Sequence, residues 1–258
     1  MRPLSELDTR SVRAVLVDID ETLTTGGKLT AEAYGALERL QQAGLRVVPV
    51  TGRPAGWCDH IARMWPVDAA VGENGAFYFF YSGGRLHKRF QDNMTSRAEK
   101  RARLDAIAAQ ILAAVPGCAL ASDQPYRETD LAIDYCEDVP PLPLEAAQRI
   151  AELMRHAGLT AKVSSIHVNG WFGDYDKLAM TRRLFAERFG LDLDAANGEV
   201  VFAGDSPNDS PMFAFFRNSV GVANVRRFES LLADAPKYVT RAASGAGFAE
   251  LADHLLRG

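Results

Sequence analysis

The sequence predicts an α/β protein with a doubly wound, Rossmann-like parallel-sheet core and a smaller α/β domain inserted into it. Two observations predict this class. Short apolar, β-rich runs alternate with helical patterns in both the first and the last third of the chain, as in parallel βαβ units. Between these stretches the rhythm changes to a hairpin pattern, which βαβ units do not contain. The 258 residues suffice for one large domain or two modest ones.

The first part of the core is predicted at residues 1–80. Thr30 is a suitable N-cap for a helix, Gly44 a suitable stop, and Leu37 and Leu40 belong to an apolar stripe at helical spacing. The predicted elements are strand 12–17, helix 30–43, strand 45–50, helix 54–64 and strand 69–71.

The inserted domain is predicted at residues 81–170. A hairpin introduces it, with Ser82-Gly83-Gly84 as the turn between strands 77–81 and 85–90. A mixed pattern follows, and its predicted elements are helix 97–115, strand 131–135, helix 144–156 and strand 161–168.

The second part of the core is predicted at residues 171–258, where the parallel rhythm returns. The predicted elements are helix 176–189, strand 199–203, helix 211–216, strand 219–222, helix 228–234, strand 237–240 and helix 248–256. One domain is therefore expected to be interrupted by another.

Composition argues against several classes of function. With 47% hydrophobic and 24% charged residues the chain resembles an ordinary globular protein, and its formal charge of −4 argues against broad nucleic-acid binding. The three cysteines are far apart, which predicts neither a disulfide framework nor a zinc site and fits a reducing cytoplasm. Residues 1–13 are too polar for a signal peptide, and no apolar run approaches the ~20 residues of a membrane span. We expect a cytoplasmic monomer or small homo-oligomer without nucleic-acid or membrane partners.

Four polar clusters fall at the carboxyl ends of predicted parallel strands, the edge where open α/β sheets bind ligands. The first is Asp18-Ile19-Asp20-Glu21-Thr22. Two carboxylates this close repel one another unless a cation lies between them, and Mg²⁺ prefers such oxygen ligands. An Asp carboxylate can also attack phosphorus. The alternative is a solvated strand end with an Asx-turn.

The other clusters supply groups that bind anions or cations. Thr51-Gly52-Arg53-Pro54 places a hydroxyl group and free amides at a helix N-terminus, which favours an anion, although a plain turn is the alternative. Lys177 can neutralise a phosphate oxygen or simply be a solvated surface lysine. Asp205 and Asp209 follow another buried strand, in a segment whose composition also suits an ordinary turn.

In this order the clusters resemble the haloacid dehalogenase superfamily, whose first motif is DxDx[TV]. The matching segments are DIDETLT, VTGR, DYDK and FAGDSPND, and the resemblance covers nearly the whole chain. The insertion is similar to the type IIB cap of the Cof-like phosphatases, and GENGA at residues 72–76 also resembles that subgroup. GDSPND followed by SPMF is similar to the mannosyl-3-phosphoglycerate phosphatases.

The resemblance implies catalytic and metal-binding roles. Asp18 attacks phosphorus, while Asp20 protonates the leaving oxygen and then activates the hydrolytic water. Mg²⁺ is held by the Asp18 side chain, the Asp20 backbone carbonyl and Asp205. Asp209 lies in the outer shell and supports the metal or Lys177.

The resemblance also implies a phosphate site. Thr51, Gly52 and Lys177 hold the phosphoryl group, and Asn208 touches the phosphate or the leaving group. One residue departs from the family pattern, because Glu21 stands where many members have glycine. Glycine would permit a positive φ angle that costs Glu some energy, which leaves the shape of this loop open.

The cap is expected to select the substrate and to exclude water when it closes. Arg127 is a candidate partner for a second anionic group, Asn169 for sugar hydroxyls and Trp171 for stacking on a sugar ring, while Asn74 lies near the hinge on the core side. The alternatives are surface charge for Arg127 and hinge packing for Trp171. His167, like the other histidines, shows no metal-ligand spacing and is expected to be structural or solvated.

The expected function is Mg²⁺-dependent hydrolysis of a small phosphorylated metabolite, a sugar phosphate or phosphoglycerate derivative, through an aspartyl-phosphate. A phosphomutase of the phosphomannomutase type would share this chemistry but need a bisphosphate activator. A non-catalytic phosphometabolite-binding protein is the third hypothesis. It should have lost a catalytic carboxylate, whereas Asp18, Asp20 and Asp205 are all present.

Overall fold

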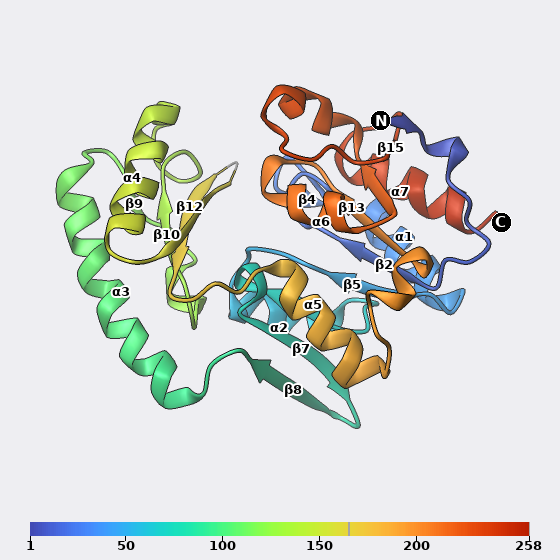
Figure 1. Cartoon of the computed structure of the whole chain (residues 1–258), viewed down its shortest axis with the longest axis horizontal. Helices are drawn as coiled ribbons and strands as arrows, with labels where there is room; N and C mark the ends of the chain where they lie inside the picture. Colours follow the sequence, from blue (N-terminus) through green and yellow to red (C-terminus); the bar gives the residue numbers. More distant parts are fainter. Residues whose placement is uncertain (165, 258) are drawn as a thin grey trace.

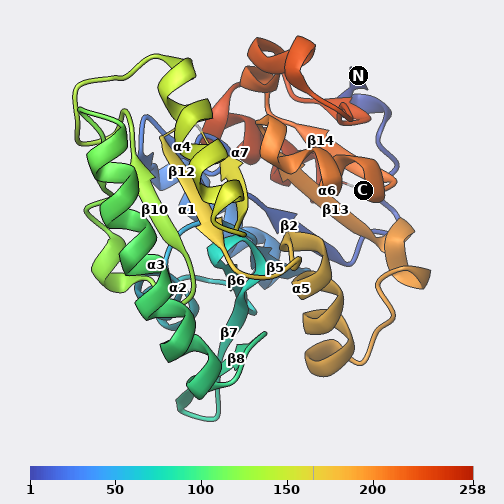
Figure 2. The same ribbon diagram turned by 60° about the vertical axis from the view of Figure 1, so that its left-hand side comes forward.

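The chain folds into a core domain and a smaller cap domain that lie side by side (Figure 1). This computed structural model describes residues 1–164 and 166–257. Both chain ends lie on the core, and a middle stretch of the chain forms the cap, as the second view also shows (Figure 2). Among the described residues, no helix combines the length and the apolar character that crossing a bilayer requires.

A six-stranded sheet, parallel throughout, forms the centre of the core. Its strand order is β1-β15-β14-β13-β2-β5. β2 (Ala14–Val17) and β13 (Val200–Gly204) are neighbours, with Val17 opposite Ala203, so the residues after these two strands emerge together at one edge. The other strands are β1 (Arg2–Pro3), β5 (Arg46–Pro49), β14 (Asn218–Gly221) and β15 (Tyr238–Val239).

Helices cover both faces of this sheet, so the core is doubly wound as the sequence predicts. α1 (Ala31–Gln42), α2 (Ala55–Met64) and α7 (Ser244–Leu255) contribute side chains to one apolar layer. α5 (Lys177–Leu184) and α6 (Ser210–Phe215) contribute to the other. Every side chain of β2 is buried, as expected for a strand that is covered on both faces.

The hairpin assigned to the inserted domain from sequence packs on the core instead. β7 (Phe77–Ser82) pairs with β8 (Arg85–Phe90) and also with β6 (Ala70–Gly72), the strand that follows α2. The chain leaves this sheet only at α3 (Met94–Ala114). Because the hairpin's partners are core residues, we propose a cap that begins near residue 93 in place of residue 81.

The cap is an antiparallel sheet of order β11-β12-β10-β9, and α3 and α4 (Leu144–His156) share one apolar cluster with it. Its strands are β9 (Ala119–Leu120), β10 (Leu131–Asp134), β11 (Thr160–Val163) and β12 (His167–Trp171). The prediction of one strand over residues 161–168 is therefore wrong. The Ser164 hydroxyl oxygen accepts the backbone N–H groups of Ile166 and His167, which favours a turn there. Ser165, which belonged to the expected strand, lies outside the described residues.

Two further differences concern short elements. The helix expected at residues 228–234 is a 3₁₀ helix over Ala223–Leu231. β3 (Thr24–Thr25) and β4 (Lys28–Leu29) form a small hairpin after the first polar cluster. Like β1 and β9, these two-residue strands are too short to show a hydrophobic period, so periodicity could not predict them.

Candidate active site

Asp18 lies buried at the carboxyl edge of the parallel sheet. It follows β2 directly, and its backbone N–H donates to the Ala203 carbonyl of β13 at 2.9 Å. The residue is only 5% exposed, and its carboxylate accepts a hydrogen bond from Lys177 Nζ at 2.7 Å. Lys177 is the first residue of α5, and Asp176 caps this helix by accepting the Ala179 N–H. The fold thus brings the first and third sequence clusters into direct contact.

Three carboxylates gather beside this ammonium group. Asp18, Asp205 and Asp209 are buried, and each offers an oxygen within 4.8 Å of the others. Lys177 Nζ also donates to Asp209 Oδ1 at 2.9 Å, so a single ammonium group faces three acids. Burial and the neighbouring acids raise the pKa of Asp18 to about 7 and that of Asp205 to about 8. The site therefore carries an excess of negative charge.

A divalent cation fits this donor set. The three carboxylates offer oxygen atoms, the ligands that a hard ion such as Mg²⁺ prefers. A cation between them would remove the repulsion that raises their pKa values. The fold therefore gathers Asp18, Asp205 and Asp209 into a group that can hold a metal ion.

The Asp20 carboxylate faces an arginine that the sequence analysis did not assign to the site. Arg53 Nη2 lies 2.8 Å from Asp20 Oδ1, and Arg53 Nε donates to the same carboxylate at 3.0 Å. The same guanidinium contacts two acids of the cap, Glu137 at 3.1 Å and Asp123 at 3.5 Å. Arg53 therefore links Asp20 to the cap. Arg53 belongs to the VTGR segment, so its position in this motif could have identified it as a site residue from the sequence.

Thr51 and Gly52, the residues expected to bind phosphate, follow β5, and Gly52 lines the same pocket as Asp18. Thr51 is fully buried, and its hydroxyl oxygen accepts the Arg53 N–H at 3.0 Å. A Cβ atom on Gly52 would come within 3.1 Å of Asn74 Oδ1, so glycine allows the Asn74 carboxamide to lie against the backbone. Asn74 is itself held at a positive φ of 57° and donates its N–H to the Thr51 carbonyl.

Asn224 supports the acidic group and was missed from sequence. Its amide nitrogen donates to Asp205 Oδ2 at 2.9 Å and to the Glu21 carbonyl at 3.0 Å. Its Oδ1 accepts the Ser244 N–H, which ties it to the start of α7. Its position shortly after β14, at the ligand-binding edge of the sheet, could have identified it as a site residue from the sequence. Glu21 has a φ of 55°, the positive value anticipated where the family pattern has glycine.

The cap residues expected to contact substrate have the following places. Arg127 and Asn169 line the same pocket as Asp18, but the Arg127 guanidinium is already bound to Asp123 and Asp130, and Asn169 donates to Asp130. Trp171 is 1% exposed and its indole N–H donates to the Tyr175 carbonyl. Their roles toward substrate stay predictions.

One cap residue and one core residue also border the site. His167 is buried, lines the Asp18 pocket, and places Nε2 2.8 Å from Glu137 Oε2. Glu73, on the core side, accepts the backbone N–H groups of Glu128 at 2.9 Å and Thr129 at 2.7 Å. These contacts hold the cap loop against the core, so the pocket lies between the two domains.

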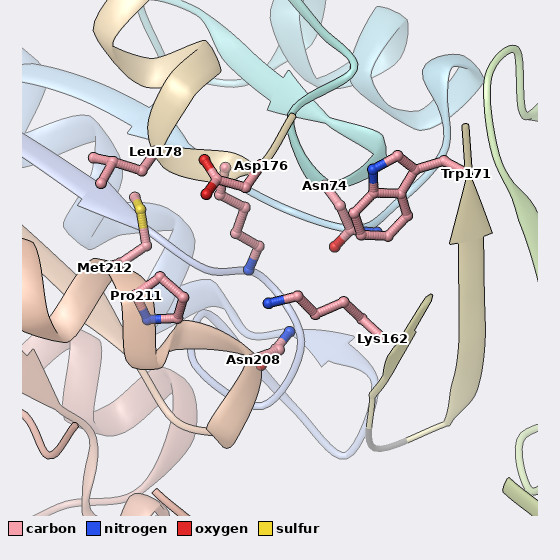
Figure 3. Close-up of a pocket in the computed structure, with 9 residues that line it drawn as sticks. Asn74, Lys162, Trp171, Asp176, Leu178, Asn208, Pro211 and Met212 are labelled. Atoms are coloured by element: carbon pink, nitrogen blue, oxygen red, sulfur yellow. The ribbon is translucent and has the colours of Figure 1, made fainter. Parts of the chain in front are cut away.

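Figure 3 shows a second pocket, which shares Asn74 and Asn208 with the Asp18 pocket. Asn208 Oδ1 accepts a hydrogen bond from Ser206, and its side chain faces that of Lys162 from the cap. Asn74 and Trp171 border the same space on the side of the hinge. The remaining lining residues are Asp176, Lys177, Leu178, Pro211 and Met212.

Comparison with known proteins agrees with the motifs and their geometry. Residues 15–99, which include the DIDETLT and VTGR segments, match the family of haloacid dehalogenase-like hydrolases. This segment is about a third of the chain. Over 95% of its length the chain is also 29% identical to a phosphoglycolate phosphatase of Pyrobaculum neutrophilum, 96% of which is covered. These similarities are those of a haloacid dehalogenase-like phosphatase.

Solved structures share the fold of both domains. A Thermoplasma acidophilum protein superposes with a TM-score of 0.71 at 18% identity, over 95% of this chain and 98% of that one. A subclass IIB sugar phosphatase gives 0.63 at 14% identity, over 94% and 98%. The core and the inserted cap therefore follow the subclass IIB arrangement that the sequence resembles.

Proposed function

We propose that this phosphatase hydrolyses the phosphate monoester of a small metabolite, with Asp18 as covalent nucleophile and Mg²⁺ as cofactor. One observation supports this above the rest: Asp18 lines a pocket between core and cap, and its carboxylate lies beside one ammonium group and two further acids. Phosphoryl transfer needs this combination of a placed nucleophile and neutralised charge.

The reaction proceeds in two displacements. An Asp18 carboxylate oxygen attacks phosphorus, the bond from phosphorus to the ester oxygen breaks, and Asp20 gives its proton to that oxygen. Asp20 then takes a proton from water, whose oxygen attacks phosphorus, and the bond between phosphorus and Asp18 breaks to release phosphate. Thr51 and Lys177 hold the phosphoryl oxygens during both steps.

The residues proposed to hold Mg²⁺ are Asp18, Asp205 and the Asp20 backbone carbonyl, with Asp209 supporting the metal or Lys177. When bound, the ion supplies positive charge that offsets the charge of the phosphoryl oxygens. Asn224 fixes the Asp205 carboxylate through its 2.9 Å hydrogen bond. Such supporting hydrogen bonds orient metal ligands and raise affinity.

The contact between Arg53 and Asp20 connects this chemistry to the cap. Arg53 touches Asp20 on the core and Glu137 and Asp123 on the cap, so the orientation of Asp20 depends on the cap lying against the core. Asp20 is 27% exposed at its side chain, and both Asp18 and Asp20 line the pocket. We infer that substrate entry requires the cap to move away and that its return orients Asp20 for proton transfer.

The experiment that tests this function measures inorganic phosphate released from phosphoglycolate, phosphoglycerates and sugar phosphates. It compares Mg²⁺ with EDTA, and the wild-type protein with Asp18→Asn. We expect release only with Mg²⁺ and an intact Asp18. No release from any ester by folded protein would contradict the proposal, and transfer between positions of one sugar that depends on a bisphosphate activator would indicate a mutase.

A further inference from the structure

One face of the cap sheet is polar and turns toward the active site. Side chains alternate along a strand, and residues directly opposite each other in an antiparallel pair share a face. Ala161 and Val168 belong to the apolar cluster of the cap together with the helices. Lys162 is paired with Asn169 and therefore lies on the other face, from which both side chains line pockets that border the catalytic residues.

Lys162 differs from the other positively charged groups around these pockets. Lys177 binds Asp18 and Asp209, and Arg53 binds Asp20 and two cap acids. Within the described part of the chain, no carboxylate lies within ion-pair distance of Lys162. The pocket does contain Asp176, but its carboxylate is occupied in capping α5.

The remaining two basic groups are also committed. Arg127 is buried and bound to Asp123 and Asp130, and His167 faces Glu137 at 2.8 Å. Lys162 is half-buried, and a positive charge that is partly withdrawn from water is unfavourable unless an anion lies beside it. Among the basic groups named here, Lys162 is thus the one whose charge can pair with an anionic group of the substrate.

The direction of phosphoryl transfer says which part of the substrate Lys162 meets. The attacking and leaving oxygens lie roughly in line through phosphorus. Since Asp18 attacks from the core side, the leaving group points toward the cap. Figure 3 shows the Lys162 side chain entering the pocket from the cap and facing Asn208 of the core. A side chain that enters from the cap therefore contacts the substituent that the leaving oxygen carries.

Building on the proposed phosphatase function, we propose that Lys162 is the residue that selects substrates by binding a carboxylate on the leaving group. The substrate class is then a small phosphorylated hydroxy acid, in which the carboxylate lies a few bonds from the ester oxygen. A neutral sugar leaving group would leave the Lys162 charge uncompensated. Asn208 and Asn169 lie nearby and provide neutral donors and acceptors for the same group.

Matched pairs of esters test this assignment. Phosphoglycolate and ethyl phosphate have the same carbon count but differ in the carboxylate, as do 3-phosphoglycerate and glycerol 3-phosphate. We expect Lys162→Met to lower kcat/KM for the preferred acid about 10- to 100-fold, the loss typical of a charge-assisted hydrogen bond, mainly through KM. The neutral partner of the pair should change by less than about threefold, and Lys162→Arg should retain most of the preference for the acid.

Arg149→Met is the charge-matched control. It removes one positive charge from an exposed ion pair on α4, away from the pocket, and should alter neither ester. Equal losses for the acid and its neutral partner in Lys162→Met, or no loss for either, would overturn the assignment to Lys162. If the wild-type protein hydrolyses no ester of the panel, the phosphatase proposal fails as well. The wild-type rate therefore distinguishes this failure from a failure of the Lys162 assignment alone, in which the wild-type protein remains active.

Discussion

Gly75→Ala is a perturbation whose effect can be worked out from two contacts. Gly75 lies in the turn between β6 and β7 and has a φ of 105°, which side chains rarely adopt. A Cβ atom there would lie 2.0 Å from the Asp176 carbonyl oxygen and 2.8 Å from the Lys177 backbone nitrogen. The glycine thus lets this turn touch the residues that begin α5, from which Lys177 reaches Asp18. The contact supplies a physical reason for glycine in the GENGA segment.

The expected cost has two parts. A non-glycine residue held at positive φ costs roughly 1–2 kcal/mol. Moving the backbone at Asp176 to relieve the overlap costs about 1–3 kcal/mol more, by analogy with overpacked cores. We therefore expect the free energy of unfolding to fall by about 2–5 kcal/mol. A shift of the Lys177 ammonium group by about 1 Å would lower kcat/KM on the order of 100-fold.

Gly83→Ala is the matched control for this prediction. Gly83 also has a positive φ, 59°, but an added Cβ would meet no atom within 4 Å. We expect about 1 kcal/mol of destabilisation and unchanged kinetics. Urea denaturation and steady-state phosphate release measure both variants. Equal losses of stability in Gly75→Ala and Gly83→Ala, with wild-type kcat/KM in both, would contradict the role given to the contact between Gly75 and the start of α5.

Three further predictions concern the supports of the site. Asn224→Ala should weaken Mg²⁺ binding about 10- to 100-fold in calorimetry, because Asp205 loses its orienting hydrogen bond. The control Asn218→Ala removes a hydrogen bond to the Gly198 carbonyl and should leave Mg²⁺ affinity unchanged. Contact with His167 and Arg53 lowers the pKa of Glu137 to about 2, so stability that is present above the ordinary Glu pKa is lost as pH falls toward 2. Between about pH 5 and about pH 3 the wild type should therefore lose about 1 kcal/mol more than Glu137→Gln in urea denaturation, after allowance for solvent screening; equal losses would contradict this. Glu73→Ala should lower the free energy of unfolding by about 3 kcal/mol or more, because the buried or half-buried N–H groups of residues 55 and 128–130 lose their acceptor. Wild-type stability in urea denaturation would count against this.

Much of the core could be predicted because its strands are buried on both faces. Residues 14–17 and 200–204 read as apolar runs that end in carboxylates, and their parallel pairing brings Asp18 and Asp205 to one edge. Thr30 and Asp176 mark the starts of helices, because their side chains accept hydrogen bonds from backbone N–H groups of the first turn. Local chemistry and the periodicity of burial therefore agree in this part of the chain.

The cap was harder to predict because its residues act through partners distant in sequence. The hairpin at residues 77–90 looks the same whether it pairs with β6 or with a cap strand, and only its partner decides the domain. Arg127 reads as a free cation, yet Asp123 and Asp130 surround it. Lys162 was overlooked, although the alternation Thr-Ala-Lys-Val-Ser places it on the polar face of a strand.

The most direct test of the central claim is to look for phosphate bonded to Asp18. The wild-type protein would be mixed with its best ester and Mg²⁺, quenched in acid within the first turnover, digested and examined by mass spectrometry. We expect the added mass of one phosphoryl group on the peptide that carries Asp18, and none on the same peptide from Asp18→Asn. Rapid release of phosphate without this adduct, or activity retained in Asp18→Asn, would contradict the claim that Asp18 is the nucleophile.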